Sequence, residues 1–213
     1  MKLALCSTWH CGLQGADLSE QQAVWDEGGW CRVWPVVDEA DRARWDYTPF
    51  VSVGPLRFGM SHEQAAVAME AQGFICTVLQ SETRHGALTR RADFRAAAAL
   101  GWSTAVTVYY RVPDLLTCVA VDALCGPQVR LDNLGLVGQV PSELTEQVFD
   151  YVTERGMSPT LSVEGDAVSD ELGFMLRAQR AGDVLLSRAF FAKFEGWAYT
   201  VHDCVPTTEW RVR

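Results

Sequence analysis

The strongest constraint on the fold is a pair of apolar segments, residues 105–112 and 115–124, that flank Pro113-Asp114. Both segments are rich in β-branched and aromatic residues, which favour strands, and Pro-Asp favours a tight turn. The pattern predicts an antiparallel hairpin. Residues 128–131 follow Gly126-Pro127, and we expect them to pair with the hairpin as a third strand.

Three segments carry the start and stop signals of helices. Ser61 and Gln64 form a capping box, and Gly73 ends the apolar stripe that follows them. A second helix is expected over 141–156, where Pro and Ser open the segment and Gly closes it. A third is expected over 169–180, because acidic residues follow a serine at its start.

Strands are expected between these helices. The predicted strands are residues 32–37, which hold Pro35 and therefore suit a sheet edge, then 74–79, 160–163 and a final hairpin of 184–194 and 197–204. Residues 80–102 fit either a helix, on an alanine-rich run, or a long bent strand. The pattern predicts an α+β fold, with antiparallel sheets and three or four short helices packed on one side.

The first fifty residues differ from the rest of the chain. They contain five of the eight tryptophans and one expected short helix, residues 19–28. We expect residues 1–50 to form a Trp-rich segment, either separate or integral to the fold, and residues 51–213 to form the α+β domain. A helix that begins at serine and ends at glycine recurs along this domain, which indicates two similar halves, 51–133 and 134–213.

Charge limits the kind of partner. The 213 residues include 18 basic and 27 acidic side chains, which gives a net charge of −9. Nucleic acid and anionic membranes repel such a chain, so we expect a basic protein as the partner. No apolar run approaches the roughly 18 residues that a membrane-spanning helix requires, so no membrane association is expected.

Composition also indicates origin and compartment. Lys2 and Lys193 are the two lysines, and the other cations are arginines, a bias typical of GC-rich bacterial genomes. The first residues lack the apolar stretch of a secretory signal. We therefore expect a bacterial cytoplasmic protein whose seven cysteines are reduced.

Tryptophan is the first candidate for binding a partner, because aromatic side chains dominate the energetics of protein interfaces. The candidate partner-binding residues are Trp9, Trp25, Trp30, Trp34 and Trp45. The alternative is that these large side chains fill the core beneath a segment with little regular structure.

An anion site is the second candidate. Arg84, Arg90 and Arg91 belong to a locally basic stretch that also contains His85 and Arg95. Arginine forks bind phosphate and carboxylate groups well, so these residues are candidate anion ligands. The alternative is a solvated basic surface with no ligand.

Two groups of cysteine and histidine residues are candidates for metal binding or thiol catalysis. Cys6, His10, Cys11 and Cys31 supply the ligand types of a zinc site, but zinc sites normally show two close pairs, and Cys31 stands alone. Packed thiols are the alternative, and the sequence predicts neither a metal nor a cofactor.

The second group lies near the C-terminus. His202 and Cys204 would share one face of the expected strand, as thiol catalysis requires. Asp203 would point to the opposite face, so these three residues make no triad. The alternative is a strand with one buried thiol, and no catalytic residue is predicted.

One short segment carries a family resemblance. Residues 54–64, GPLRFGMSHEQ, resemble the Gly-Met helix entry of BamE-like and β-lactamase-inhibitor-like domains. In those families a strand enters a Gly-Met turn, and a capped helix then leads into an antiparallel sheet. The resemblance implies a non-enzymatic, protein-binding sheet, and it assigns no site residue.

These observations favour a protein-binding module. We expect an immunity-type or inhibitor-type protein that masks a basic partner by stoichiometric binding, because an acidic surface speeds association with a cationic cleft. The alternative is an enzyme or small-ligand-binding protein whose site gathers residues from distant segments.

Overall fold

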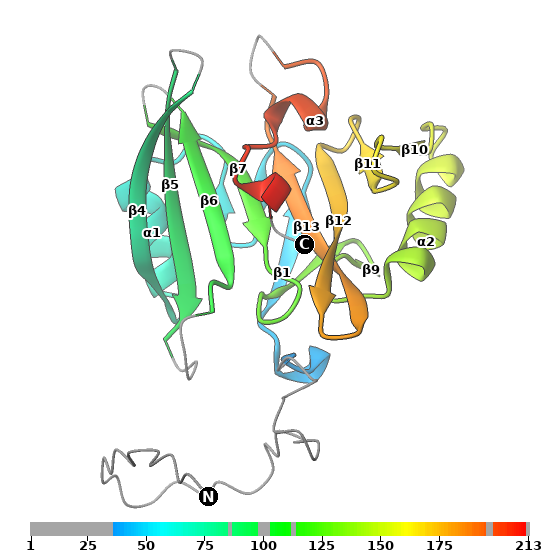
Figure 1. Cartoon of the computed structure of the whole chain (residues 1–213), viewed down its shortest axis with the longest axis horizontal. Coiled ribbons are helices and arrows are strands. Elements are labelled where there is room, and N and C mark those ends of the chain that lie inside the picture. The colour runs from blue at the N-terminus through cyan, green and yellow to red at the C-terminus, as the bar shows by residue number, and fades with distance from the viewer. Residues whose placement is uncertain (1–35, 85–86, 98–102, 112–113, 195–197, 212–213) are drawn as a thin grey trace, which may run out of the picture. The chain divides into compact units, whose positions relative to one another are not determined.

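The computed structural model describes residues 36–84, 87–97, 103–111, 114–194 and 198–211. The chain divides into two compact units, residues 1–32 and 33–213, and every described residue belongs to the second. The α+β class is confirmed: the described residues form two sheets, mostly antiparallel, with short helices (Figure 1). No helix in this part of the chain is long and apolar enough to span a membrane.

The first half of the unit contains one α-helix and the whole of the small sheet. Its elements are η1 (Glu39–Asp41), β1 (Arg44–Thr48), β2 (Ser52–Val53), β3 (Leu56–Arg57), α1 (His62–Glu70), β4 (Phe74–Arg84), β5 (Ala87–Ala96), β6 (Val106–Arg111), β7 (Leu115–Val121), β8 (Gln128–Leu131) and β9 (Leu134–Gly135). The helix starts at the expected capping box, and the expected hairpin is formed by β6 and β7.

The second half repeats the order of one helix followed by four strands. Its elements are α2 (Pro141–Glu154), β10 (Thr160–Leu161), β11 (Ala167–Ser169), β12 (Phe174–Ala181), β13 (Val184–Ala192), α3 (Val201–Cys204) and η2 (Glu209–Arg211). The large sheet has the order β10-β11-β12-β13-β7-β6-β5-β4. Strands β4–β7 follow α1, and strands β10–β13 follow α2. The last strand of each set lies at the centre of the sheet, where β13 pairs antiparallel with β7.

The small sheet has the order β3-β2-β1-β8-β9. Strand β1 belongs to the Trp-rich segment, residues 1–50, and it pairs in parallel with β8. The expectation that residues 128–131 extend the β6–β7 hairpin is therefore wrong. Arg42, which precedes β1, holds the segment between β7 and β8, because its guanidinium donates hydrogen bonds to the carbonyl groups of Ala123, Leu124 and Gly126.

Two apolar clusters cover opposite faces of the large sheet. The main cluster lies between this sheet, the small sheet and helices α1 and α2, which contribute Met69 and Leu144 among others. The second cluster lies on the other face, where Val201 and Cys204 of α3 pack against Cys118 and Phe190. The central strands β7 and β13 are therefore buried on both faces.

The expected helix at 169–180 is wrong. These residues form the end of β11, a tight turn and β12, and β12 pairs with β13 over its whole length. Gly173 makes the turn with a φ of 72°, and a Cβ there would lie 2.6 Å from the ring of Phe50. Strand pairing and burial on both faces outweigh the helix signals of the serine and acidic residues.

The expected strand at 197–204 is also wrong. Residues 201–204 form α3, because Thr200 and Asp203 make a second capping box. The strand expected at 32–37 is absent from its described residues, 36 and 37, and the helix expected at 19–28 lies outside the described residues. Residues 80–84 and 87–96 are strand, which settles the ambiguity between helix and strand for that segment.

The C-terminal segment lies on the second face of the large sheet, and a buried ion pair attaches it there. The Glu209 carboxylate, which is 2% exposed, accepts hydrogen bonds from Arg188 of β13 and, at 2.5 Å, from the Tyr109 hydroxyl of β6. Arg188 also contacts Asp122 at 3.2 Å. Arg177 of β12 donates to the Glu209 carbonyl group, and its guanidinium lies over the Trp210 ring. These contacts hold α3 and η2 against the sheet.

We expect Glu209→Ala to lower the free energy of unfolding by about 3–5 kcal/mol, because it leaves Arg188 buried and only partly neutralised. Urea denaturation followed by circular dichroism measures this change. Glu39→Ala is the control, since Glu39 pairs with Arg130 at 3.9 Å on the surface and its loss should cost less than about 1 kcal/mol. Equal effects of the two substitutions would contradict the structural role of Glu209.

The two long helices allow a second test, since they begin differently. Ser61 accepts a hydrogen bond from the backbone amide of Gln64, whereas no side chain caps α2. We expect Ser61→Ala to cost about 1 kcal/mol of unfolding free energy, and Ser142→Ala to change it by less than about 0.5 kcal/mol. The same urea titration measures both, and a larger effect at Ser142 would argue against the capping box.

Candidate functional site

Trp45 does not face a partner. Its side chain is 3% exposed and packs edge-to-face on Phe74, with the ring centroids 5.7 Å apart. A Cβ at Gly54 would lie 2.5 Å from the Trp45 ring, so the backbone closes over this side chain. The prediction of a partner-binding role is therefore wrong for Trp45, and Trp9, Trp25, Trp30 and Trp34 lie outside the described residues.

The structure does not bring the predicted anion ligands together. Arg90 and Arg91 are adjacent in β5 and so project from opposite faces of the sheet. Arg90 forms an ion pair with Asp114, and Arg91 forms one with Asp93 at 2.8 Å. Burial opposes the charge of Arg91, but its hydrogen bonds to Asp93 raise its pKa overall. Arg84 lies in β4, and its side chain is outside the description.

The residues considered for thiol chemistry also separate. His202 and Cys204 are two positions apart on a helix, which places them about 200° apart around its axis. Cys204 is buried beside Cys118, whereas His202 is exposed and lies against Trp210, with ring centroids 4.8 Å apart. Asp203 accepts hydrogen bonds from the amides of Tyr199 and Thr200 and so caps the helix.

No group of three or more potential metal ligands occurs among the described residues. The cysteine and histidine residues considered for zinc, Cys6, His10, Cys11 and Cys31, lie outside them.

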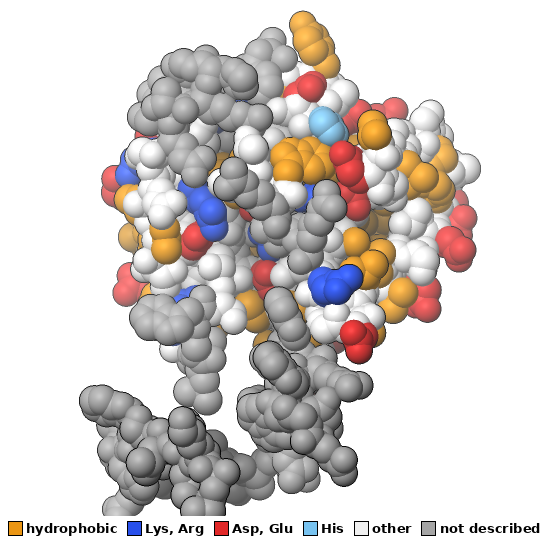
Figure 2. Space-filling view, in the orientation of Figure 1, with side chains coloured by type: hydrophobic (Ala, Val, Ile, Leu, Met, Phe, Trp, Pro, Cys, Tyr) orange, Lys and Arg blue, Asp and Glu red, His pale blue; other side chains and the backbone are white. Residues whose placement is uncertain are grey.

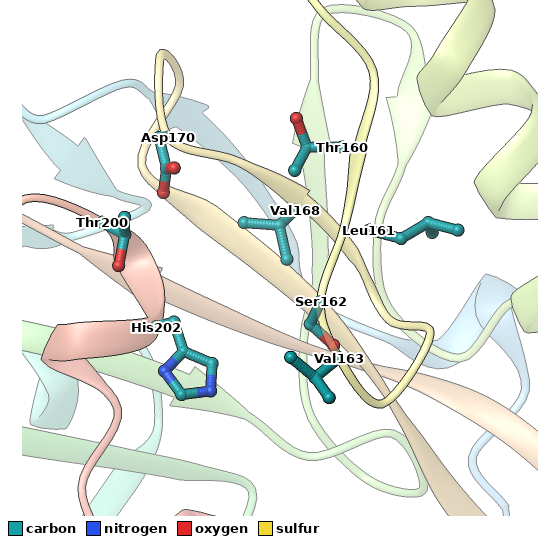
Figure 3. Close-up of a pocket in the computed structure, with 8 residues that line it drawn as sticks. All are labelled: Thr160, Leu161, Ser162, Val163, Val168, Asp170, Thr200 and His202. Carbon is teal, nitrogen blue, oxygen red and sulfur yellow. The ribbon is translucent and has the colours of Figure 1, made fainter.

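A small cavity lies between the β10–β11 hairpin and α3, at one end of the large sheet. Its volume is about 260 Å³. The lining residues come from two segments that are distant in sequence, residues 160–170 and 200–202: Thr160, Leu161, Ser162, Val163, Val168, Asp170, Thr200 and His202. Figure 3 shows the His202 ring beside Ser162 and Val163, with Val168 above them in this view. The cavity combines an apolar wall with a polar wall.

The polar wall is built by turns and a cap. Asp170 follows β11, and one of its oxygens accepts a hydrogen bond from the Val201 amide at 2.7 Å. Its other oxygen accepts none from a described residue. In Figure 3 the Asp170 carboxylate points toward the space between Thr200 and Val168. The wall therefore presents a carboxylate oxygen, the hydroxyl groups of Thr160, Ser162 and Thr200, and an imidazole ring.

Two exposed carboxylates near the cavity, those of Glu164 and Asp203, have a lowered pKa. Backbone hydrogen bonding, followed by the Ser162 hydroxyl, lowers the pKa of Glu164. The Tyr199 amide and then the Thr200 hydroxyl lower the pKa of Asp203. Arg177 of β12 is buried and contacts Asp166 at 3.5 Å. This part of the surface therefore favours a cationic ligand.

Exposed apolar side chains surround the cavity. Val163 is 97% exposed, Tyr199 is 84% exposed, and Leu161 is about half exposed. Figure 2 shows apolar, acidic and histidine side chains gathered over α3 and the β10–β11 hairpin. Large exposed aromatic and aliphatic side chains near a pocket are typical of interaction surfaces.

Helix α2 carries the second feature of this end of the molecule. Glu143, Glu146, Asp150 and Glu154 recur at helical spacing, so they form one stripe along the helix, and all four are exposed. No ion pair joins any of them to a described residue. Figure 2 shows acidic side chains at the edge of the molecule where α2 lies. We call these four residues the acidic stripe.

Residues 141–171 hold eight acidic residues and one basic residue, Arg155. The acidic stripe and the cavity therefore lie in one strongly acidic part of the chain. The helical spacing of the stripe is visible in the sequence. The cavity had no such signal, since its walls meet only when α3 packs beside β11.

Comparisons with protein-family models, with curated proteins and with solved structures found no match. The site is therefore interpreted from its geometry and charge alone.

Burial predicts how the described thiols react. Burial and the nearby Asp122 carboxylate raise the pKa of Cys125 to about 12. Cys76 is an exposed residue, but partial desolvation of its thiol raises its pKa as well. Cys118 and Cys204 are buried.

We expect iodoacetamide at pH 8 to alkylate Cys76 slowly and to leave Cys118, Cys125 and Cys204 unmodified, because the thiolate is the reactive form. Peptide mass spectrometry reads each site, and the reduced chain in urea is the control in which all four react. Rapid alkylation of native Cys204 would contradict its burial and revive the thiol-catalysis hypothesis.

Proposed function

We propose that this chain is a stoichiometric protein-binding module, of immunity or inhibitor type, that masks a basic partner. The observation that carries the proposal is the acidic stripe on α2, whose carboxylates are exposed and unpaired among the described residues. Unpaired carboxylates on one helix face create a local negative potential that attracts a cationic surface. The apolar residues beside the cavity supply contacts that slow dissociation.

Other features support this choice of partner. The net charge of −9 disfavours nucleic acid and anionic membranes. The resemblance of residues 54–64 to inhibitor-like domains also favours a binding sheet over catalysis. The proposed compartment is the bacterial cytoplasm, in keeping with the free thiols of Cys76 and Cys125.

Small-ligand binding is the second candidate function, and the cavity beside His202 favours it. Native mass spectrometry of the purified chain separates the two functions. A small molecule that copurifies in equimolar amount would favour ligand binding, whereas a copurifying basic protein would favour the first proposal.

We expect neutralisation of the acidic stripe to slow association with the basic partner by about tenfold or more at low salt, because charge steers encounter. The partner is first captured from a bacterial lysate on the tagged chain. Stopped-flow measurements at several salt concentrations then give the association rate of the quadruple variant Glu143→Gln, Glu146→Gln, Asp150→Asn and Glu154→Gln.

The control removes the same total charge from exposed positions outside the stripe. It combines Asp38→Asn, Asp46→Asn, Glu70→Gln and Asp183→Asn. We expect this variant to change the association rate by less than about threefold. Equal slowing in both variants would show that net charge acts without the stripe, and a partner that is not basic would overturn the proposal.

A further inference from the structure

We propose that the cavity between the β10–β11 hairpin and α3 receives one arginine side chain of the basic partner. This inference rests on the proposed function and specifies how the partner is held. It concerns a separate set of residues from the acidic stripe, so the two ideas are tested independently.

The size of the cavity suits a single side chain. Its volume of about 260 Å³ lies below the range of pockets that hold drug-sized ligands, roughly 300–1,000 Å³. It is also open to solvent beside exposed Val163 and Tyr199, so a side chain that projects from a protein surface can enter. A bulky cofactor has no comparable room there.

The apolar wall fits the methylene stem of arginine. Leu161, Val163 and Val168 present aliphatic carbon to the cavity. Long basic side chains bury their methylene groups against such surfaces and keep the charged head near polar groups. The apolar wall therefore accounts for the stem, and the polar wall must account for the head.

The polar wall offers a negative charge and hydrogen-bond acceptors. The Val201 amide donates to one Asp170 oxygen, and the other Asp170 oxygen is available to a guanidinium group. The Thr200 hydroxyl oxygen lines the same space and accepts one hydrogen bond, from the Asp203 amide, which leaves it a second lone pair. The Ser162 hydroxyl oxygen, in contrast, already accepts from the amides of Glu164 and Asp166. A guanidinium group has five N–H donors and no acceptor, so a carboxylate beside a hydroxyl oxygen suits it.

His202 explains the preference for arginine over lysine. Its exposed ring borders the cavity and lies beside Ser162. The planar guanidinium group stacks on aromatic rings, whereas an ammonium group is compact and strongly hydrated. The cavity thus offers a carboxylate for the charge and a ring for the plane of the head group.

The charges around the cavity do not oppose a cation. The pKa of Glu164 and that of Asp203 are lowered, so both residues add negative charge beside the opening. Arg177 lies beneath the surface and is neutralised by Asp166. An incoming guanidinium group therefore meets a net negative rim.

The test uses small probes on the full chain and needs no partner. N-acetyl-arginine-N-methylamide is titrated into ¹⁵N-labelled protein, and amide shifts are followed by NMR. We expect saturable shifts at Val168, Asp170 and His202, with a dissociation constant of about 1 mM, since a probe this small makes few contacts. The citrulline analogue, which is isosteric and neutral, should bind at least about tenfold more weakly.

Two substitutions then locate the binding. Asp170→Asn keeps an oxygen for the Val201 amide but removes the charge, and we expect about tenfold weaker binding of the arginine probe. His202→Ala removes the stacking ring at an exposed position and should weaken binding about threefold or more. Asp183→Asn is the matched control, because Asp183 lies in the exposed turn at the other end of β12 and its loss should leave binding unchanged.

Three results would overturn the inference: equal binding of arginine and citrulline probes, equal or tighter binding of the lysine and leucine analogues, or no saturable shift at the cavity. Thermal denaturation shows whether a variant is folded, and Asp183→Asn checks the effect of charge. If the probe fails but neutralising the acidic stripe still slows the partner, the binding module remains and only the arginine site falls. If the probe binds and no basic partner exists, the site stands and the proposed function falls.

Discussion

The buried ion pair between Arg188 and Glu209 is the interaction on which the candidate site depends. Arg188 lies in β13, at the centre of the large sheet, where an unpaired charge would be costly. Asp122 contributes one carboxylate, but a second comes from the C-terminal segment, which must therefore cross the sheet. This crossing places α3 beside β11 and so creates one wall of the cavity. Apolar packing of Val201 and Cys204 and the Val201–Asp170 hydrogen bond then fix α3 against the sheet.

The central pairing of β7 with β13 explains why the two halves of the unit differ in their surfaces. Both strands are buried on both faces, so neither offers a surface to a partner. The surfaces available to a partner therefore lie at the two ends of the sheet. At one end β4 and β5 carry arginines, of which Arg90 and Arg91 pair with carboxylates of the same chain. At the other end the carboxylates of the acidic stripe form no ion pair with a described residue, and Arg155 at the end of α2 pairs with Asp132 instead, which leaves that end with an excess of negative charge.

Local signals predicted the elements that local interactions form. The capping box at Ser61 and the turn between β6 and β7 were readable, because each depends on residues close in sequence. Residues 169–180 were misread, because pairing with β13 decides their conformation and leaves no local trace. The Thr200–Asp203 capping box was present but was read as part of a hairpin. The cavity was not predictable, since it joins turns and a helix that only tertiary packing brings together.

The acidic stripe and the cavity suit two different stages of binding. Coulomb attraction from exposed carboxylates acts over roughly a Debye length, about 8–10 Å, so the stripe influences how often a basic partner arrives in a usable orientation. Contacts in the cavity form only after arrival, and they are short-ranged and partly shielded from water. Such contacts chiefly set the rate of dissociation. A chain that carries both features near one end of a single sheet separates attraction from retention, and each can change without loss of the other.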